Sequence, residues 1–386
     1  MTGGRPAADH IWRMQAKQDV DYPIILTDNL LDPNNPALAE ASGGGTARRL
    51  FVVDAEVHRL HGDSLIRYLD HYGIDHAILA VPVSESTKTL ETARQLARDI
   101  GALGLPRKSV GTAIGGGVLL DVAGVAFSLL RRGTPYIRVG TTLLAVIDAA
   151  FGVKVGVNDD GQKNRLGAYY PPRAALLDRA FLATLPHRHL VNGAGEIVKL
   201  ALMLDSHLFD LLEQHGKRAI DAAFQPGDDD GPLAEILRRS VGHMRDELAA
   251  NLWEHDLTRL ADFGHAISPT LEMRALPELL HGEAVAIDMA LFAVVARRRG
   301  LDRGETDRIL GLLRELGLPI HHPLLSRSML SAALAATVEH RDGRQRLPLP
   351  VGIGQARFVD DVTVDELADA AEYLAARAET TAAGAL

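Results

Sequence analysis

The stretch "SVGTAIGGGVLLDVAGVAFSLLRRG", residues 109–133, decides the expected fold of the chain. It reads as a buried β-strand, a turn of three consecutive glycines and a buried helix, which together are a unit of parallel α/β sheets. Glycines at such a turn let backbone N–H groups approach a phosphate at the positive end of a helix dipole. Because the spacing is not GxGxxG, a tight turn without a ligand explains the stretch equally well.

The segments around this stretch repeat the alternation of strand and helix. A helix is expected near residues 62–72, and residues 89–105 have the periodicity of an amphipathic helix. Apolar runs typical of strands are "YPIILT" (22–27), "LFVVDAEV" (50–57), "DHAILAVPV" (75–83) and the beginning of "TPYIRVGTTLLAVID" (134–148).

The pattern changes after about residue 181, where long helical periodicities dominate. They cover residues 191–214, 231–250, 281–299 and 304–316. We therefore expect an α/β plus all-α protein, with a Rossmann-like parallel-sheet domain at residues 1–180 and a mainly helical domain at residues 181–386. Residues 1–20 are expected to form a loose arm.

Composition limits the classes of function. The net charge of −9 over 386 residues argues against a nucleic-acid partner, because a phosphate backbone requires basic surface. The absence of cysteine excludes disulfides and thiolate metal sites. The first twenty residues contain no apolar signal region, and the longest apolar stretch, residues 117–130, is too short to span a bilayer. We expect a cytoplasmic enzyme with a small-molecule substrate and no membrane partner.

Three residues of the helical half suggest a metal site. They are Glu196 in "NGAGEIVKLALML", His265 in "DFGHAISPTLEM" and His281 in "LLHGEAVAIDMALFAVV". One carboxylate and two imidazoles are a ligand set for catalytic zinc with an open position. A single histidine is more often a core residue, and no pair has the HxxxH or HxH spacing, so spacing alone makes this only a suggestion. Asp288 lies on the same face of its buried helix as His281 and needs a partner.

Polar residues of the α/β half have alternative interpretations. Asp54, at the end of an apolar run, could accept a hydrogen bond from a ribose hydroxyl or cap a helix. Glu85 and Lys88 are three residues apart at a helix start, which is typical of a capping turn with a surface ion pair. Residues 151–172 form a loop-like stretch rich in hydrogen-bond donors, which suits a phosphate or polyol substrate, although a solvated basic loop is the alternative.

Several motifs occur in the order found in one known family. They are "GGGVLLDVAGVAFSLLRRG", "IRVGTTLLAVID", "GVKVGVN", "KNRLGAYYPP", "TLPHRHLVNGAGEIVK", "FGHAISPTLE" and "HGEAVAID". Over roughly residues 50–355 the chain thereby resembles the sugar phosphate cyclase superfamily, the relatives of 3-dehydroquinate synthase. The resemblance implies NAD, zinc with cobalt as an alternative, a sugar phosphate substrate and a homodimer.

The motif around His265 indicates a branch of this family. Dehydroquinate synthases carry a second histidine four residues after the metal-binding one, whereas this chain has Pro269. This "SP" form, the "NLWEHDLTRLADFGH" stretch (251–265) and the "KNRLGA" segment with Arg165 are similar to 2-epi-5-epi-valiolone synthases. The branch implies cyclisation of sedoheptulose 7-phosphate with loss of phosphate, by transient oxidation with NAD, elimination, reduction and intramolecular aldol addition.

The alternatives remain open at this point. A desmethyl-4-deoxygadusol synthase or a 2-epi-valiolone synthase would use the same substrate, and Thr270 is a position where product control could lie. 3-Dehydroquinate synthase comes next. A polyol dehydrogenase of the glycerol dehydrogenase type and a non-catalytic binding protein are further alternatives.

The resemblance also assigns residues to roles. It places the metal on Glu196, His265 and His281. It places the dinucleotide on Asp54, Glu85, Lys88, Gly115, Gly116, Gly117, Asp121, Thr141, Thr142, Asp148 and Lys163. It places the substrate on Lys154, Asn164, Lys199, Asp262, Arg259, Arg346 and Arg132, the last of these in a partner subunit's site. Many relatives have asparagine where this chain has Asp262, so hydroxyl recognition is the expected role of this carboxylate.

Overall fold

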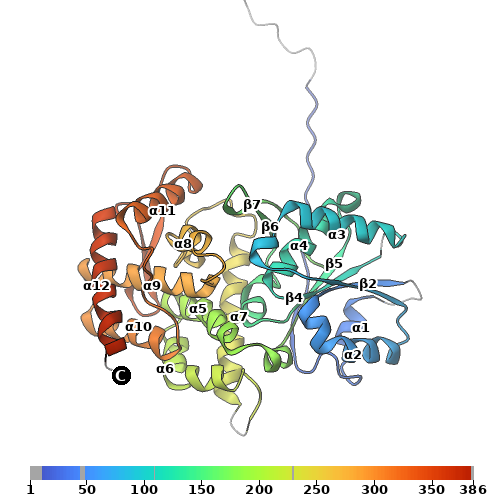
Figure 1. Cartoon of the computed structure of the whole chain (residues 1–386). Coiled ribbons are helices and arrows are strands. Elements are labelled where there is room, and N and C mark those ends of the chain that lie inside the picture. Colours follow the sequence, from blue (N-terminus) through green and yellow to red (C-terminus); the bar gives the residue numbers. More distant parts are fainter. Residues whose placement is uncertain (1–10, 44–47, 108, 228–229, 384–386) are drawn as a thin grey trace, which may run out of the picture.

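The N-terminal half is built on a six-stranded parallel sheet (Figure 1). The structure is a computed structural model that describes residues 11–43, 48–107, 109–227 and 230–383. The strand order is β1-β8-β5-β4-β2-β3, and every neighbouring pair is parallel. The strands are β1 (Ile24–Thr27), β2 (Arg49–Asp54), β3 (His76–Val81), β4 (Gly111–Gly115), β5 (Tyr136–Gly140) and β8 (Ala175–Asp178).

Both faces of this sheet are buried, as expected for parallel strands covered by crossover helices. Along β2, Leu50 and Val52 belong to one hydrophobic cluster, while Phe51 and Val53 belong to the other. The first cluster includes residues of α3 (Leu90–Ala102) and α4 (Gly117–Leu129); the second includes residues of α1 (Ala37–Ala41) and α2 (Ala55–His71). The expected α/β half is therefore confirmed.

The quoted stretch forms β4, a turn at Gly116 and α4, as its pattern predicts. The glycines have a packing reason that is independent of any ligand. A Cβ on Gly115 would lie 2.5 Å from the side chain of Leu119. α4 therefore sits close to the sheet only because the turn is made of glycine.

Residues 154–169 differ from the expected loop, because they form an antiparallel hairpin. The hairpin consists of β6 (Lys154–Asp159) and β7 (Gln162–Tyr169). Its turn contains Asp160 at φ 47° and Gly161 at φ 70°, the left-handed pair that an Asp-Gly dipeptide supplies in two-residue hairpin turns. The expectation of a loop overlooked this Asp-Gly turn signal.

The C-terminal half is helical, as expected, and is centred on α5 and α9 (Figure 1). The single pattern expected at residues 191–214 is in fact two helices, because Asp205 has extended backbone angles and its side chain accepts a hydrogen bond from Leu208 N. The helices are α5 (His187–Leu204), α6 (Ser206–Asp221), α7 (Gly231–Ala250), α8 (Ser268–Arg274), α9 (His281–Arg298), α10 (Arg303–Glu315), α11 (Arg327–His340) and α12 (Val364–Ala383), with a hairpin of β9 (Leu347–Gly352) and β10 (Gln355–Val359).

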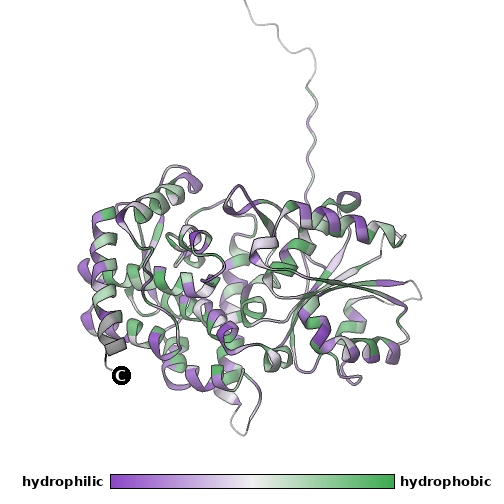
Figure 2. Cartoon of the chain, viewed as in Figure 1, coloured by the Kyte–Doolittle hydropathy of each residue, from purple (hydrophilic) through white to green (hydrophobic). Residues whose placement is uncertain are grey.

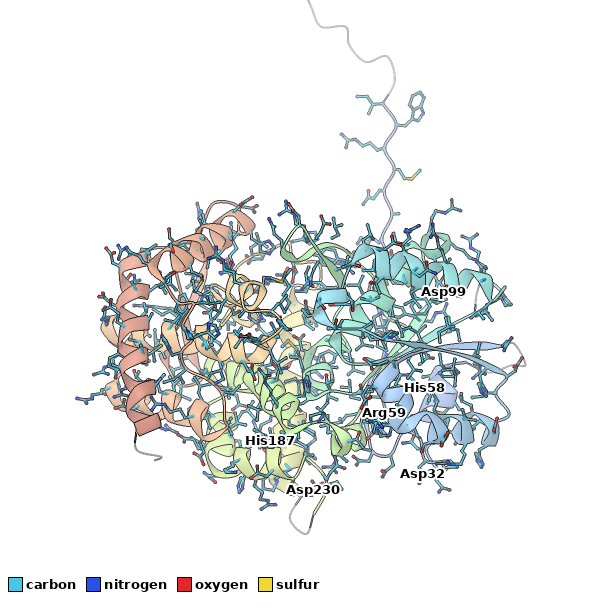
Figure 3. All side chains as sticks on the ribbon, in the orientation of Figure 1. Asp32, His58, Arg59, Asp99, His187 and Asp230 are labelled. Carbon is cyan, nitrogen blue, oxygen red and sulfur yellow. The ribbon has the colours of Figure 1, made fainter. Side chains whose placement is uncertain are left out.

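The outer surface is polar and carries many of the charged side chains. The outer helices have hydrophilic positions beside hydrophobic ones (Figure 2). Arg59, Asp99 and His187 point outward and are exposed (Figure 3). Of the loose arm expected at residues 1–20, residues 11–20 have no regular structure and lead away from the body, whereas residues 1–10 lie outside the described residues. None of the helices in the described part of the chain has the length and apolar character that crossing a membrane would require.

Candidate active site

The carboxyl edge of the sheet holds the first group of predicted residues. Asp54 ends β2, and the turn of Gly115, Gly116 and Gly117 follows the neighbouring strand β4. The chain proceeds from β2 to one side of the sheet and then returns to the other side of β2, so β2 and β4 flank a topological switch point. Ligands of open α/β sheets bind at such a crevice. Asp54 also caps α2 by accepting a hydrogen bond of 2.8 Å from Glu56 N, so the capping role is present in the structure.

The glycine turn packs closely against the segment that follows β5. A Cβ on Gly116 would lie 2.9 Å from Cγ2 of Thr142, and one on Gly117 would lie 3.4 Å from Ala149. The buried hydroxyl of Thr141 lacks a hydrogen-bond partner among the residues that the structure describes. A backbone cradle at a helix N-terminus with an unpaired hydroxyl beside it fits the phosphates of a dinucleotide.

Lys88 is the centre of a polar network that joins three segments of the sheet half. Its Nζ lies 2.6 Å from Oδ2 of Asp121 on α4 and donates a hydrogen bond of 2.6 Å to Asn164 on β7. Asn158 on β6 donates a hydrogen bond of 2.8 Å to the carboxylate of Glu85. The surface ion pair suggested for Glu85 and Lys88 is therefore wrong, because the β6–β7 hairpin packs over this turn and buries Lys88. Burial lowers the pKa of Lys88, but Asp121 and Glu85 outweigh it and raise the pKa, so Lys88 stays charged.

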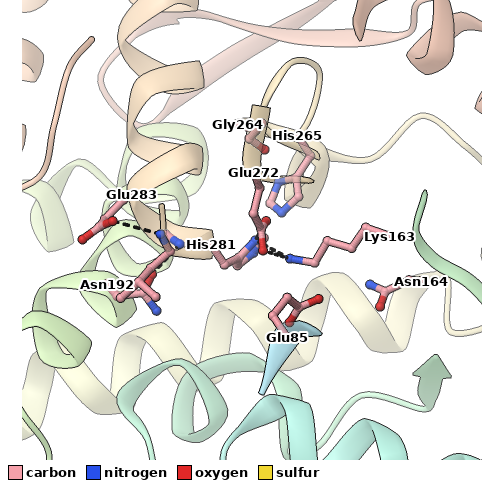
Figure 4. A network of polar contacts seen from close by, with 12 residues as sticks. Glu85, Lys163, Asn164, Asn192, Gly264, His265, Glu272, His281 and Glu283 are labelled. Carbon is pink, nitrogen blue, oxygen red and sulfur yellow. Dashed lines mark hydrogen bonds and ion pairs between the residues drawn. The ribbon is translucent and has the colours of Figure 1, made fainter. Parts of the chain in front are cut away.

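In the helical half, Glu196, His265 and His281 converge, and Figure 4 shows the two histidines of this cluster. Oε1 of Glu196, on α5, lies 3.6 Å from Nε2 of His265 and 3.5 Å from Nε2 of His281. One ligand atom from each residue falls within 4.8 Å of the others. Both carboxylate oxygens of Glu196 are buried; Oε2 pairs with the ammonium of Lys199, whereas Oε1 faces the two histidines and lacks a hydrogen bond within the described ranges. Buried polar atoms without hydrogen bonds need a partner, and a metal ion held by two imidazoles and one carboxylate would provide it.

The electrostatics around this cluster keep two of its members in the form that a metal requires. Burial raises the pKa of Glu196, but the ion pair with Lys199 and the two histidines outweigh it and hold the pKa well below the ordinary value. Burial, with Lys199 nearby, lowers the pKa of His265 to about 3. Glu196 is therefore ionised and His265 neutral. For His281, burial and Lys163 lower the pKa, but Glu272 and Glu196 reverse the effect and raise it.

Close packing of α5 against the start of α9 brings Glu196 and His281 together. Gly282 N donates a hydrogen bond of 2.6 Å to the side chain of Asn192 on α5. A Cβ on Gly282 would clash with the carbonyl oxygen of Asn192, and one on Gly195 would lie 2.7 Å from the carbonyl oxygen of Gly282. The two backbones can approach this closely only because both positions are glycine.

His265 is held by the turn that carries it. Gly264 has φ 77°, a left-handed conformation that favours glycine, and Nδ1 of His265 lies 3.0 Å from the carbonyl oxygen of Phe263. Oδ2 of Asp288, on α9, accepts hydrogen bonds from Ile267 N at 2.5 Å and Ser268 N at 2.8 Å. The polar partners expected for Asp288 are thus these two backbone N–H groups. Through them Asp288 connects the loop after His265 to the helix that begins with His281.

Next to the metal cluster lies a group of predicted substrate residues. Lys154, at the start of β6, lies 2.7 Å from Oε1 of Glu254, which also pairs with Arg259. Arg259 contacts Asp262 at 2.6 Å, and the buried Arg341 contacts the same carboxylate at 3.3 Å. Cations and carboxylates therefore alternate from the hairpin to the helical half.

Asp148, in the π-helical turn η3 (Ala145–Ala149), faces this group as well. Burial and the charge of Glu196 raise its pKa, against the opposing effect of Lys199 and Lys154. Although Asp148 was expected to contact the dinucleotide, its electrostatic neighbours are the residues predicted for metal and substrate.

Three of the predicted site residues lie outside the groups described so far or next to other partners than expected. Arg132 is exposed beyond the end of α4, a 13-residue helix whose other end is the glycine turn, and lies about 20 Å along the helix from that turn. The backbone N–H of Arg346 donates to Asp360 at 2.8 Å, and its partly buried side chain has no described hydrogen bond. Lys163, expected at the dinucleotide, instead lies 2.5 Å from Glu272 and 3.1 Å from Nδ1 of His281.

Three residues that the structure brings into the site were not among the predicted ones. They are Glu254, Glu272 and Arg341. A weak signal existed for Glu272, which stands seven residues after His265 in a quoted motif. Glu254 stands with its partner Arg259 in another quoted motif, residues 251–265. No local pattern indicates Arg341, because its partner Asp262 comes from a distant segment of the chain.

A parallel sheet with a phosphate cradle, facing a buried Glu-His-His cluster on a helical half, defines a class of dinucleotide-dependent metalloenzymes. Family models described as "3-dehydroquinate synthase N-terminal" and "3-dehydroquinate synthase C-terminal" match residues 78–192 and 193–340. The chain belongs to the sugar phosphate cyclases of the 3-dehydroquinate synthase type.

Relatives within the family are similar along almost the whole chain. A 2-epi-5-epi-valiolone synthase from Streptomyces hygroscopicus subsp. jinggangensis is 50% identical over 95% of this chain and 90% of its own length. A demethyl-4-deoxygadusol synthase from Trichormus variabilis is 37% identical over 94% of this chain and 90% of its own. The solved structure of a 2-epi-5-epi-valiolone synthase from the same Streptomyces, with NAD+ and Zn2+ bound, has a TM-score of 0.91 at 49% identity and covers 95% of this chain and all of that one.

Proposed function

We propose that this protein converts sedoheptulose 7-phosphate into 2-epi-5-epi-valiolone with release of phosphate. The observation that carries the proposal is the buried Glu196–His265–His281 cluster beside a row of cations, in a chain with half its residues identical to known synthases of this product. The enzyme class, an NAD- and metal-dependent sugar phosphate cyclase, follows from the same relatives.

The residues present fit the two cofactors that a relative contains. The glycine turn, Thr141 and Asp54 would hold NAD, with the Lys88 network behind them. Glu196, His265 and His281 would hold zinc, or cobalt in its place. Together these groups supply reversible oxidation of a substrate hydroxyl, which acidifies the neighbouring C–H bond.

The chain's own side chains would bind the substrate and balance its charge. Lys154 and Asn164 would bind the phosphate from the hairpin, where Lys154 pairs with Glu254 and Asn164 accepts a hydrogen bond from Lys88. Lys199 keeps Glu196 ionised and adds positive charge where oxyanions form. Asp262, held between Arg259 and Arg341, is suited to accept hydrogen bonds from substrate hydroxyls.

In this proposal the leaving phosphate accepts the proton from the adjacent carbon, and the C–O bond to phosphate breaks. The ring then opens, and an intramolecular aldol addition forms the carbocycle. The substrate loses the elements of phosphoric acid and no net oxidation occurs. The side chains of the site would have to keep the intermediates bound and exclude water until the ring has closed.

The nearest alternative keeps the substrate and changes the product. Demethyl-4-deoxygadusol synthase is the second candidate, and the lower identity to that relative makes it the weaker one. Thr270, in the first turn of α8, stays the position where we expect product control. Pro269 stands where a dehydroquinate synthase carries its second histidine, which makes that activity a still weaker candidate.

We also propose a homodimer in which Arg132 reaches the partner's site. Three consecutive residues, Arg131, Arg132 and Gly133, have positive φ angles of 56°, 63° and 117°. Arg131 donates to Leu105 O at 2.9 Å, which anchors the turn, while Arg132 stays exposed. We further propose a domain division near residue 180, within the short helix η4 (Arg179–Thr184) that joins the last sheet strand to the helical half.

The experiment that tests the function offers two substrates to purified protein with Zn2+ and a catalytic amount of NAD. One is sedoheptulose 7-phosphate and the other is the seven-carbon acid phosphate used by dehydroquinate synthase. Phosphate release from the first alone, without NADH accumulation, supports the proposal, and product NMR then separates the cyclitols. Release from the second alone, or net accumulation of NADH with either substrate, contradicts it.

A further inference from the structure

Glu272 is a buried carboxylate that none of the roles proposed above uses. It lies on α8 and is 2% exposed. Its Oε2 is 2.9 Å from Nδ1 of His281, and its Oε1 is 2.5 Å from Nζ of Lys163 (Figure 4). Glu272 therefore contacts the imidazole of His281 with one oxygen and the ammonium of Lys163 with the other.

The contact with Nδ1 determines which nitrogen of His281 can bind a metal. Nε2 of His281 faces Glu196 at 3.5 Å and is the nitrogen directed toward the cluster. Nε2 can donate its lone pair to a metal only if Nδ1 carries the proton. Glu272 accepts that proton in a hydrogen bond, which stabilises this tautomer and fixes the ring.

Lys163 acts on the same ring in the opposite direction. Its ammonium lies 3.1 Å from Nδ1 of His281, within a site that would also hold a dication. A second cation at this distance disfavours the metal and weakens the negative charge that Glu272 directs at the imidazole. Because Lys163 comes from β7 of the sheet half and Glu272 from α8 of the helical half, this ion pair connects the two halves next to the metal cluster.

We propose that Glu272 is a positioning residue that sets the metal affinity of the Glu196–His265–His281 site by fixing the metal-binding tautomer of His281, and that Lys163 opposes this effect. The inference rests on the proposed function, because it takes His281 as a metal ligand. It predicts opposite effects for the two partners of one ion pair. If the pair served only to hold the two halves together, loss of either partner would weaken the site.

The test measures affinity for metal alone, by competition between metal-depleted protein and a chromophoric chelator for Zn2+. Glu272→Gln keeps the shape and one acceptor but removes the charge, and we expect about 10–100-fold weaker binding, the usual effect of losing a partner behind a metal ligand. Lys163→Met should bind Zn2+ at least as tightly as the wild type. Glu278→Gln, an exposed glutamate just after α8, is the matched control and should leave the affinity unchanged.

Further measurements distinguish a failure of the inference about Glu272 from a failure of the proposed metal site. The visible spectrum of bound Co2+ should change in Glu272→Gln, because the altered imidazole changes the ligand field. Equal weakening by Glu272→Gln and Lys163→Met, with lower melting temperatures of both metal-free variants, would overturn the inference in favour of a purely structural pair. Unchanged affinity in Glu272→Gln would overturn it as well. Full metal binding by His281→Ala would instead contradict the proposed metal site, and with it the proposed function.

Discussion

Replacing Asp288 by asparagine should change how the stability of the protein depends on pH. Asp288 is completely buried, and its Oδ2 accepts both hydrogen bonds from the loop that follows His265. Its other oxygen, Oδ1, lacks a hydrogen-bond partner in the described part of the chain. An asparagine can make the same two hydrogen bonds through its carbonyl oxygen, so the substitution removes the charge and keeps the geometry.

The size of the effect follows from the pKa of this carboxyl group. Burial outweighs the two hydrogen bonds and raises the pKa of Asp288 from 3.8 to about 6. A carboxyl group with a raised folded-state pKa contributes stability that is fully present below its unfolded-state pKa and is lost as the pH rises through about 6. A shift of this size corresponds to roughly 3 kcal/mol in total, of which about 2 kcal/mol lies between pH 4.5 and 7.5.

The assay is urea-induced unfolding of wild type and Asp288→Asn, both metal-depleted, at several pH values from 4.5 to 7.5. Other titrating groups are common to both proteins, so the difference in the free energy of unfolding isolates Asp288. This difference should move by about 2 kcal/mol in favour of the variant as the pH rises. Asp99→Asn, at an exposed aspartate, should leave the wild-type profile in place. A constant difference across this range would refute the reasoning.

Three further outcomes are expected. Glu196→Gln or His281→Ala should abolish metal binding and turnover together, measured by metal analysis and phosphate release; full activity in metal-depleted variants would contradict the ligand assignment. Lys154→Ala should lower kcat for phosphate release by about 10²–10³-fold while leaving the melting temperature unchanged, because this side chain is 55% exposed; unchanged release would remove Lys154 from the site. Gly282→Ala should cost about 1–3 kcal/mol of stability, because its Cβ would meet the carbonyl of Asn192; an unchanged urea midpoint would show that the two helices can separate at no cost.

The fold class could be predicted because its signals are local. The apolar period of each strand, the glycine turn at residues 115–117 and the helical periodicity after residue 181 all appear within single segments. The predicted elements were wrong where one or two polar residues interrupt such a periodic segment. The Asp160–Gly161 turn makes a hairpin of an expected loop, and Asp205 divides one helical pattern into two helices.

The sequence by itself determined which residue types were available for chemistry. Without cysteine, a transition metal had to be held by histidine and carboxylate, and the motifs indicated Glu196, His265 and His281. The tertiary structure brings these three side chains together. Their convergence depends on the close approach of α5 and α9 at glycine positions.

Only the tertiary structure decided the partners of these residues. Lys163 and Glu272 are 109 positions apart in the chain yet 2.5 Å apart in space, and Asp262 meets the distant Arg341 at 3.3 Å. A buried charge must find an opposite charge or a hydrogen bond, but the sequence does not specify which one. That choice is made when the hairpin packs against the helical half, since packing sets the distances over which electrostatic interactions act.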